Sequence, residues 1–154
     1  MRRLIGIVAV LAAGAGAQAA APDVLFAQRC AMCHQANGAG LPGQFPRLAG
    51  RAATLAQSPP GRRYLALVML NGISGTIAAD GQTYAGLMPS LAALPDTDLA
   101  AVLTHAVRLA PPAKGPKPAP FTPAEIAAVR KEGPLGMARM PAERKALAGA
   151  GLLP

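Results

Sequence analysis

Three segments of the chain place apolar residues where a helix would turn one face toward a core. The first begins near Asp23, which we predict as its N-cap, and runs to His34. The second spans about residues 61–70 and ends at the stop signal of residues 71–72. The third follows Pro95, and its apolar stripe consists of Leu99, Val102, Leu103 and Ala106. The pattern predicts a mainly helical protein.

Long loops are expected between these helices, over residues 35–50 and 72–86. Loops of this length are unusual in a compact domain unless they enclose something. Aromatic residues make up only 3 % of the chain and Trp is absent, so the side chains alone would build a thin core. Both features favour a large buried prosthetic group.

Residues 111–154 differ in composition from the helical part. Their first part is rich in proline and is predicted as an extended linker. Thr122 and Glu125 then form a capping-box pattern, so a short helix is expected there and another over residues 141–148. We therefore divide the mature chain into a main domain, residues 22–110, and this C-terminal extension. An extension that lies on the main domain is favoured over one that docks a partner.

Residues 1–21 have the three parts of a secretory signal peptide. A basic start is followed by a short apolar run, residues 4–13, and by small residues suited to a signal peptidase. The apolar run is roughly half as long as a membrane span needs. We expect cleavage after Ala19 or Ala21, export from the cytoplasm and no membrane span in the mature chain. An uncleaved N-terminal anchor is the alternative.

Both cysteines of the chain lie within four positions, in the sequence Cys30-Ala-Met-Cys33-His34. A disulfide across two intervening residues would remove little entropy from the unfolded chain and would be a poor staple. A thiol–disulfide redox centre of this spacing usually opens a helix in an alternating strand–helix fold, and no such alternation is present. Zinc would need further ligands, but the only other histidine is His105 and there is no third cysteine.

The remaining explanation is covalent attachment of haem, for which Cys-x-x-Cys-His is the known signature. Residues at i and i+3 of a helix share a face, so Cys30 and Cys33 would both reach the vinyl groups along one edge of a porphyrin. His34 would then place an imidazole nitrogen under the iron. One such motif predicts one haem c. The predicted export agrees with this, because the attachment takes place outside the cytoplasm.

A methionine is the expected second axial ligand, because a thioether opposite the histidine makes an electron-transfer site of raised potential. Met88 is the strongest candidate, since it lies in a turn-rich stretch before a helix and is followed by Pro89. Met69 lies in the middle of a predicted helix, where it would fill the core. Met140 also precedes a proline, but it lies with Met137 beyond the proline-rich break.

Residues 23–109 resemble the class I c-type cytochromes, especially the short bacterial periplasmic kind with one haem. The resemblance rests on five pieces in the right order, which are residues 30–40, 45–50, 70–75, 84–89 and 98–104. It implies an all-α cytochrome c fold of three to five helices, with long loops wrapped around one covalently bound haem. It also implies that the carbonyl of Pro46 accepts the proton of the His34 ring and so orients it. Relatives usually carry an aromatic residue at the position of His105, and we expect His105 to pack between helices or lie on the surface.

The chain is basic, with 15 Lys and Arg residues against seven Asp and Glu. Signal cleavage would remove two of the arginines and leave a formal charge of +6. This charge favours acidic partners, while its spread and the few aromatic residues argue against nucleic-acid binding. Five arginines are candidates for a rim that steers an acidic redox protein: either some of them form such a rim, or they are solvated or paired with haem propionates. They are Arg29, Arg47, Arg51, Arg62 and Arg63.

Together these features predict an electron-transfer protein rather than an enzyme. Its iron, held by His34 and Met88 in both oxidation states, would carry single electrons in the periplasm. The donor would be a dehydrogenase or respiratory complex, and the acceptor a protein such as a terminal oxidase. A dedicated cytochrome subunit of a periplasmic dehydrogenase, for alcohols or a sulfur compound, is the alternative that the extension suggests. A haem peroxidase or gas-binding protein is a further alternative if Met88 does not bind the iron.

Overall fold

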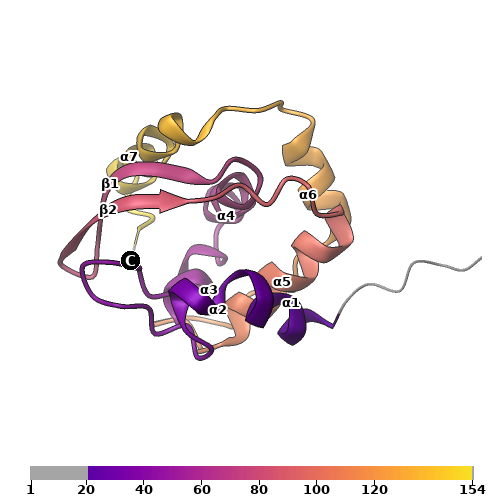
Figure 1. Ribbon diagram of the computed structural model, residues 1–154, viewed down its shortest axis with the longest axis horizontal. Helices are drawn as coiled ribbons and strands as arrows, with labels where there is room; N and C mark the ends of the chain where they lie inside the picture. Colours follow the sequence, from indigo (N-terminus) through magenta and orange to yellow (C-terminus); the bar gives the residue numbers. More distant parts are fainter. Residues whose placement is uncertain (1–20, 154) are drawn as a thin grey trace, which may run out of the picture.

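The computed structural model describes residues 21–153, which form a mainly helical fold with a small antiparallel hairpin at one edge (Figure 1). The predicted signal peptide, residues 1–21, lies outside the described residues apart from Ala21. The elements are α1 Pro22–Arg29, α2 Ala31–His34, α3 Arg51–Leu55, α4 Pro59–Asn71, β1 Ile73–Ala79, β2 Gln82–Met88, α5 Asp96–Arg108, α6 Pro123–Arg130, the 3₁₀ helix η1 Met137–Arg139 and α7 Met140–Gly149. The mainly helical class is confirmed, with seven α-helices in this part of the chain where three to five were expected, and with a hairpin in addition.

The first helix differs from the prediction at both ends. It begins at Pro22 with Ala21 as its N-cap, so the prediction of Asp23 as the N-cap is wrong. Proline suits the first helical position because its φ is already fixed there, and the carboxylate of Asp23 in the first turn complements the helix dipole. The helix also breaks at Cys30, where φ is −122°, and α2 continues the chain to His34.

The central helix α4 begins two residues earlier than expected, because Ser58 caps it. The Ser58 side chain accepts a hydrogen bond from the Gly61 amide at 3.2 Å. The helix ends at Asn71 and Gly72 as predicted. Gly72 has a φ of 68°, and a Cβ at this position would collide with the carbonyl oxygen of Met88. Glycine is therefore required where the end of α4 passes the end of β2.

Helix α1 packs directly against α5. The expected stripe of α5 is buried at each of its four positions, Leu99, Val102, Leu103 and Ala106. The ring of Phe26 on α1 lies 5.0 Å from the ring of His105, tilted by 41°. Of the two alternatives expected for His105, packing between helices and a place on the surface, the structure shows the packing contact.

The prediction of a loop over residues 72–86 is wrong, because this segment forms the hairpin of β1 and β2. The strands pair from Ile73 with Met88 at the base to Ala79 with Gln82 next to the turn. Asp80 and Gly81 make the turn, with φ values of 49° and 71°. Two positive φ values in a two-residue turn are the geometry that suits the right-handed twist of paired strands.

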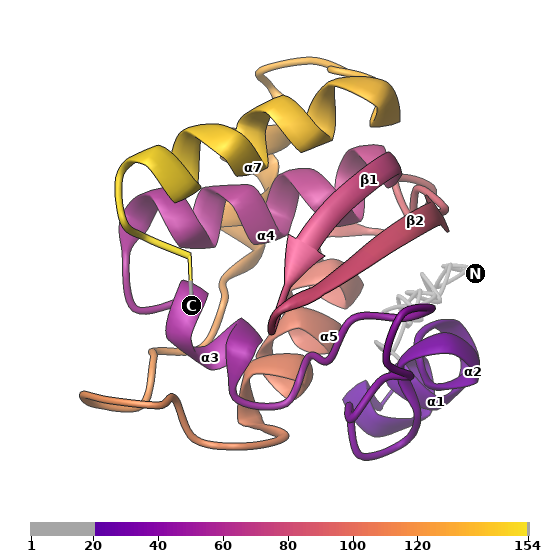
Figure 2. The same ribbon diagram turned by 90° about the vertical axis from the view of Figure 1, so that its left-hand side faces the viewer.

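The C-terminal extension lies along the rest of the protein. Helix α6 packs against α5 and α4, and α7 packs against α4 and β1. Figure 2 shows α7 running beside α4 and above the hairpin. Buried side chains of the extension belong to the same hydrophobic core as those of α4 and α5, and they include Phe121, Ile126, Val129, Met140 and Leu147. The extension therefore shares its core with the main domain, and the boundary at residue 110 stays a prediction.

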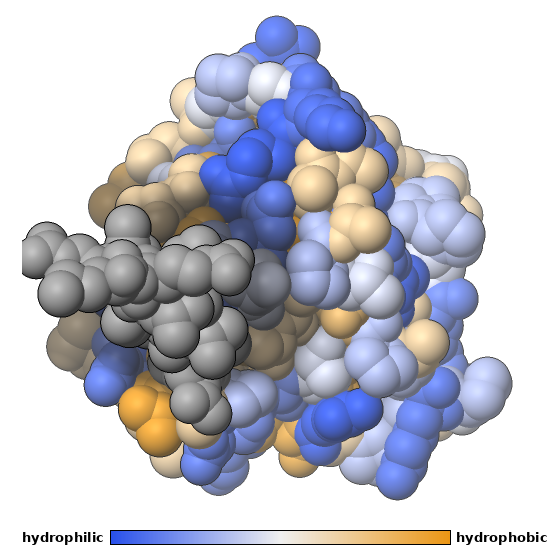
Figure 3. Space-filling view, turned by 90° about the vertical axis from the view of Figure 1, so that its right-hand side faces the viewer, coloured by the Kyte–Doolittle hydropathy of each residue, from blue (hydrophilic) through white to orange (hydrophobic). Residues whose placement is uncertain are grey.

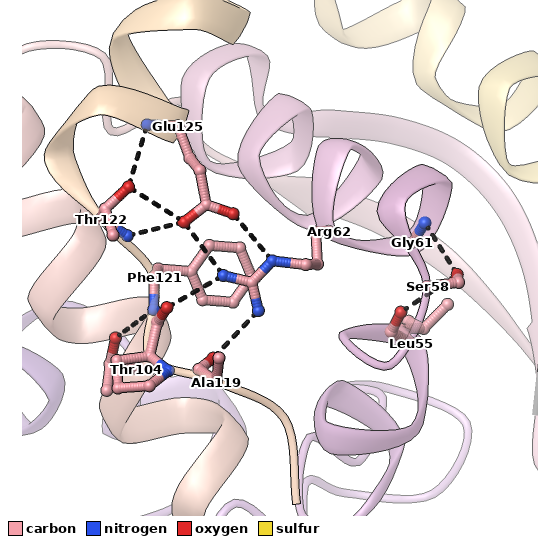
Figure 4. A network of polar contacts seen from close by, with 10 residues as sticks. Leu55, Ser58, Gly61, Arg62, Thr104, Ala119, Phe121, Thr122 and Glu125 are labelled. Atoms are coloured by element: carbon pink, nitrogen blue, oxygen red, sulfur yellow. Dashed lines mark hydrogen bonds and ion pairs between the residues drawn. The ribbon is translucent and has the colours of Figure 1, made fainter.

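Arg62 on α4 joins the extension to the main domain through one guanidinium group (Figure 4). Its Nε and Nη2 donate to the two carboxylate oxygens of Glu125, at 2.8 and 3.0 Å. Its Nη1 donates to the Ala119 carbonyl, and the guanidinium lies 4.0 Å above the ring of Phe121. The predicted capping box of Thr122 and Glu125 is also confirmed. One arginine thus fixes both the linker and the start of α6.

Candidate haem-binding site

His34 has the environment of a metal-ligating histidine. Its side chain is buried on α2, and its Nδ1–H donates to the carbonyl of Pro46 at 2.8 Å. Because a carbonyl only accepts, the proton is on Nδ1 and the lone pair is on Nε2. Burial lowers the pKa of His34, although the hydrogen bond to Pro46 opposes this. The ring is therefore neutral at physiological pH, which is the form that binds metal ions.

Cys30 and Cys33 are free thiols held one helical turn apart. The backbone amide of His34 donates to the carbonyl of Cys30 at 2.8 Å, so the turn persists although the helix breaks there. Burial, together with the neighbouring Cys33, raises the pKa of the Cys30 thiol to about 11. No disulfide joins the two cysteines. Nor does any group of three or more His, Cys, Asp or Glu side chains suited to a metal ion occur within residues 21–153.

Met88 is the last residue of β2, half-buried against the hydrophobic core. The chain that follows is tied to the end of α4. The Ser90 hydroxyl donates to the Leu70 carbonyl at 2.6 Å, and the Leu91 amide donates to the Met69 carbonyl at 2.8 Å. Met88 therefore lies between a paired strand and an anchored segment, rather than in the turn-rich stretch that the sequence suggested.

The other methionines of the described chain have other environments. Met69 is buried in α4, as predicted for a core residue, and Met140 is fully buried at the start of α7. Met137 is half-buried in η1. Met32 lies between the two cysteines and is 90 % exposed. Figures 1 and 2 show the hairpin that carries Met88 on one side of the molecule's interior and α2 on the other.

These residues fit a covalently bound haem. The two free thiols lie one turn apart, and the adjacent buried imidazole has an Nε2 lone pair that the Pro46 contact leaves available. A half-buried thioether is carried by the facing hairpin. Imidazole and thioether are the axial donors of electron-transfer haem proteins. Helices, attachment motif and donor set together define a c-type cytochrome.

Comparison with known proteins agrees with the geometry. The chain belongs to the cytochrome c family, which it matches over residues 19–110. It is 42 % identical over 144 residues to a protein described as cytochrome c-552 from Thermus thermophilus, covering 92 % of this chain and 95 % of that protein. A second Thermus thermophilus cytochrome c-552 is 44 % identical over 126 residues, covering 80 % of this chain and 93 % of the relative. An alignment of 144 residues necessarily extends beyond residue 110, so the similarity includes much of the C-terminal extension.

The family confirms three predictions. The chain is a class I c-type cytochrome, it has the cytochrome c fold, and it carries covalently bound haem c. It is accordingly an electron-transfer protein. Among the described residues no helix is both long and apolar enough to cross a membrane.

Most of the five arginines considered for a basic rim form ion pairs within the chain itself. Arg47 and Arg51 pair with Asp80, Arg62 pairs with Glu125, and Arg63 pairs with Glu132 and Glu143. Only Arg29 of the five forms no ion pair with another residue of the range 21–153. Sequence reasoning missed these pairs because the partners are 29 to 80 residues apart in the chain.

Proposed function

We propose that the protein is a monohaem electron carrier of the bacterial periplasm, with His34 and Met88 as the axial ligands of the iron. Cys30 and Cys33 would form the two thioether bonds to the porphyrin. The observation that carries this proposal is the hydrogen bond from His34 Nδ1 to Pro46, which leaves Nε2 of a buried, neutral ring for the iron. Haem supplies a reversible one-electron couple when bound.

Each proposed ligand is positioned by hydrogen bonds to backbone groups. This suits an iron site whose charge changes while its ligands stay in place. His34 is oriented by the Pro46 carbonyl. Met88 is followed by a segment tied to α4 through Ser90 and Leu91. A site that keeps its ligands in both oxidation states reorganises little on electron transfer. It also leaves no open position for a substrate, in contrast to a peroxidase or a gas carrier.

The extension supports a carrier more than a dedicated dehydrogenase subunit. Its apolar side chains are buried in the chain's own core rather than presented to a partner. Residues 1–21, which resemble a signal peptide, support export to the periplasm. In that compartment the protein would pass electrons from a dehydrogenase or respiratory complex to an acceptor such as a terminal oxidase.

Spectroscopy of the mature wild-type protein tests the proposal. We expect the ferric protein to show the sulfur-to-iron charge-transfer band of methionine ligation. We expect the ferrous protein not to bind carbon monoxide, because both axial positions are filled. A ferric protein without the band, or a ferrous protein that takes up carbon monoxide readily, would instead indicate an open site of the peroxidase or gas-binding kind.

We further propose acidic docking surfaces on the redox partners. Seven exposed basic residues form no ion pair with another residue of the described range, and they are Arg29, Arg108, Lys114, Lys117, Lys131, Arg139 and Lys145. Only two carboxylates, Asp23 and Asp98, are likewise without an ion pair within residues 21–153. Hydrophilic side chains also predominate on the side of the molecule shown in Figure 3, with apolar ones scattered among them.

The charge imbalance predicts how salt affects electron transfer. The second-order rate constant for oxidation by an anionic reagent should fall as ionic strength rises, and that for a cationic reagent should rise. Stopped-flow kinetics with one reagent of each sign measures both. Equal salt dependence for the two reagents would contradict a basic docking surface.

A further inference from the structure

Asp80, in the turn of the hairpin, is bound by two arginines from different parts of the chain. Its Oδ1 accepts from Arg51 Nη1 at 2.7 Å and from Arg47 Nη2 at 3.2 Å, and its Oδ2 accepts from Arg47 Nε at 3.2 Å. Arg47 belongs to the loop after α2, and Arg51 is the first residue of α3. We call these three residues the Asp80 clasp. It connects the tip of the hairpin to the loop and helix that follow the haem-attachment motif.

The clasp lies next to the group that orients the histidine. Arg47 directly follows Pro46, whose carbonyl accepts the hydrogen bond from His34 at 2.8 Å. Arg47 also donates from Nη1 to the Ala49 carbonyl at 2.9 Å, which stiffens the loop at the same point. A displacement of Arg47 would therefore also shift the neighbouring Pro46 carbonyl, which accepts the proton of the His34 ring.

The other end of the hairpin carries Met88. Seven residue pairs connect the turn to the base, where Met88 pairs with Ile73. The base is anchored to α4 by the hydrogen bond from Ser90 to Leu70 and by the close passage of Gly72. Near the tip, β1 is also held by Arg144 of α7, whose Nη2 donates to the Ala78 carbonyl at 2.7 Å. A two-stranded hairpin is marginally stable alone, so these anchors determine where its strands lie.

We propose that Asp80 is a positioning residue for the axial methionine: it holds the Met88 strand against the loop that orients His34. Of the anchors described above, the clasp is the one that joins the methionine side of the site to the histidine side. This inference rests on the proposed ligation by Met88. It assigns Asp80 an effect on how firmly the sulfur stays on the iron, in addition to any effect on folding.

The two halves of the clasp differ in strength. The side chain of Arg51 is 5 % exposed, whereas that of Arg47 is 47 % exposed and that of Asp80 is 30 % exposed. Solvent screens the Arg47 pair, so Arg51 contributes most of the attraction. Partial burial raises the pKa of the Asp80 carboxyl, but the hydrogen bonds and charges of Arg47 and Arg51 outweigh it and hold the pKa below its usual value. The carboxylate is therefore charged at neutral pH.

Replacement of Asp80 by Asn tests the proposal in the haem-loaded protein. Asn tolerates the positive φ of this turn position, so the change removes the charge and leaves the turn. Imidazole is titrated into the ferric protein, where it displaces the methionine sulfur and abolishes the sulfur-to-iron band. We expect Asp80→Asn to bind imidazole about fivefold more tightly than the wild type, a factor appropriate to a partly exposed ion pair. Asp23→Asn, an equal change of charge at an exposed position of α1, should bind as the wild type does.

A purely structural role predicts a different result. In that case Asp80→Asn would lower the denaturation midpoint but leave the imidazole affinity unchanged under native conditions, and our assignment would be wrong. Absence of the sulfur-to-iron band from the wild type would instead refute the proposed ligation. If Asp80→Asn does not fold, Arg47→Gln removes the exposed half of the clasp, together with the hydrogen bond from Arg47 to the Ala49 carbonyl. This variant should tighten imidazole binding about twofold, and an unchanged affinity would overturn the proposal equally.

Discussion

Replacing Met88 by Leu should abolish the sulfur-to-iron band of the ferric protein completely. Leucine has nearly the same volume but no donor atom, so the fold is kept while one axial ligand is lost. The reduction potential should fall by on the order of 0.2 V, a fraction of the range over which axial ligands set haem potentials. The ferrous variant should bind carbon monoxide at the vacated position. Absorption spectra during a redox titration measure the band and the potential, and a carbon monoxide titration measures the binding.

Met69→Leu is the matched control, because the chemical change is the same and the site is a buried core position in α4. It should retain the band and cost at most about 1 kcal/mol of unfolding free energy. Loss of the band in Met69→Leu and its retention in Met88→Leu would show that Met69, and not Met88, is the sulfur ligand. This result would contradict our assignment.

Shortening Ile126 to Ala should destabilise the whole protein, although the residue lies in the extension. Ile126 on α6 is fully buried in the core shared with α4 and α5. Loss of its methyl and methylene groups leaves a cavity and should lower the free energy of unfolding by about 3 kcal/mol. Far-ultraviolet circular dichroism during denaturant unfolding should show one transition at a lower denaturant concentration.

Val24→Ala provides the comparison, because Val24 on α1 is 45 % exposed. Its loss should change the unfolding free energy by less than about 0.5 kcal/mol. If the extension folded independently, Ile126→Ala would give a different result. Residues 111–154 would then unfold at a lower denaturant concentration, and the transition of the remaining residues would be unchanged. Two transitions would therefore show that the shared core does not couple the parts.

The attachment site was predictable because its chemistry is local. Cys30, Cys33 and His34 lie within five positions, and their spacing alone matches the haem-attachment signature. The position of Pro46 followed from the resemblance to the cytochromes, and the structure places its carbonyl on the His34 ring. The stripe of α5 and the capping box at Thr122 were likewise predictable, since helical period and capping depend on residues within a few positions.

The hairpin was missed although the sequence contains a signal for it. Asp80-Gly81 is one of the dipeptides most typical of a two-residue hairpin turn. The flanking segments contain much Ala and Gly, so the alternation of apolar and polar residues is faint, and the glycines suggested a loop. Tyr84 is buried while its neighbours Thr83 and Ala85 are exposed, which is the alternation expected of a strand. The composition of the segment does not reveal this alternation.

The ion pairs could not be predicted from local sequence. Arg62 meets Glu125 only because α6 folds back on α4, and Asp80 meets Arg51 only because the hairpin tip reaches α3. Such pairs depend on the tertiary arrangement, so the sequence left open whether the arginines form a basic rim, are solvated or pair with haem propionates. Five of the seven carboxylates of the chain are used in these internal pairs. The exposed basic charge consequently lies on other residues, several of them lysines of the extension.

The intact mass of the mature protein, produced in a host that attaches haem, tests the central claim most directly. We predict a polypeptide that begins near Pro22 and carries the mass of one haem, which denaturation and acid extraction do not remove. The double variant Cys30→Ser, Cys33→Ser should release its haem under the same treatment. A wild-type polypeptide with the bare mass of its sequence, or one whose haem is extracted as easily as that of the double variant, would contradict covalent attachment at Cys30 and Cys33.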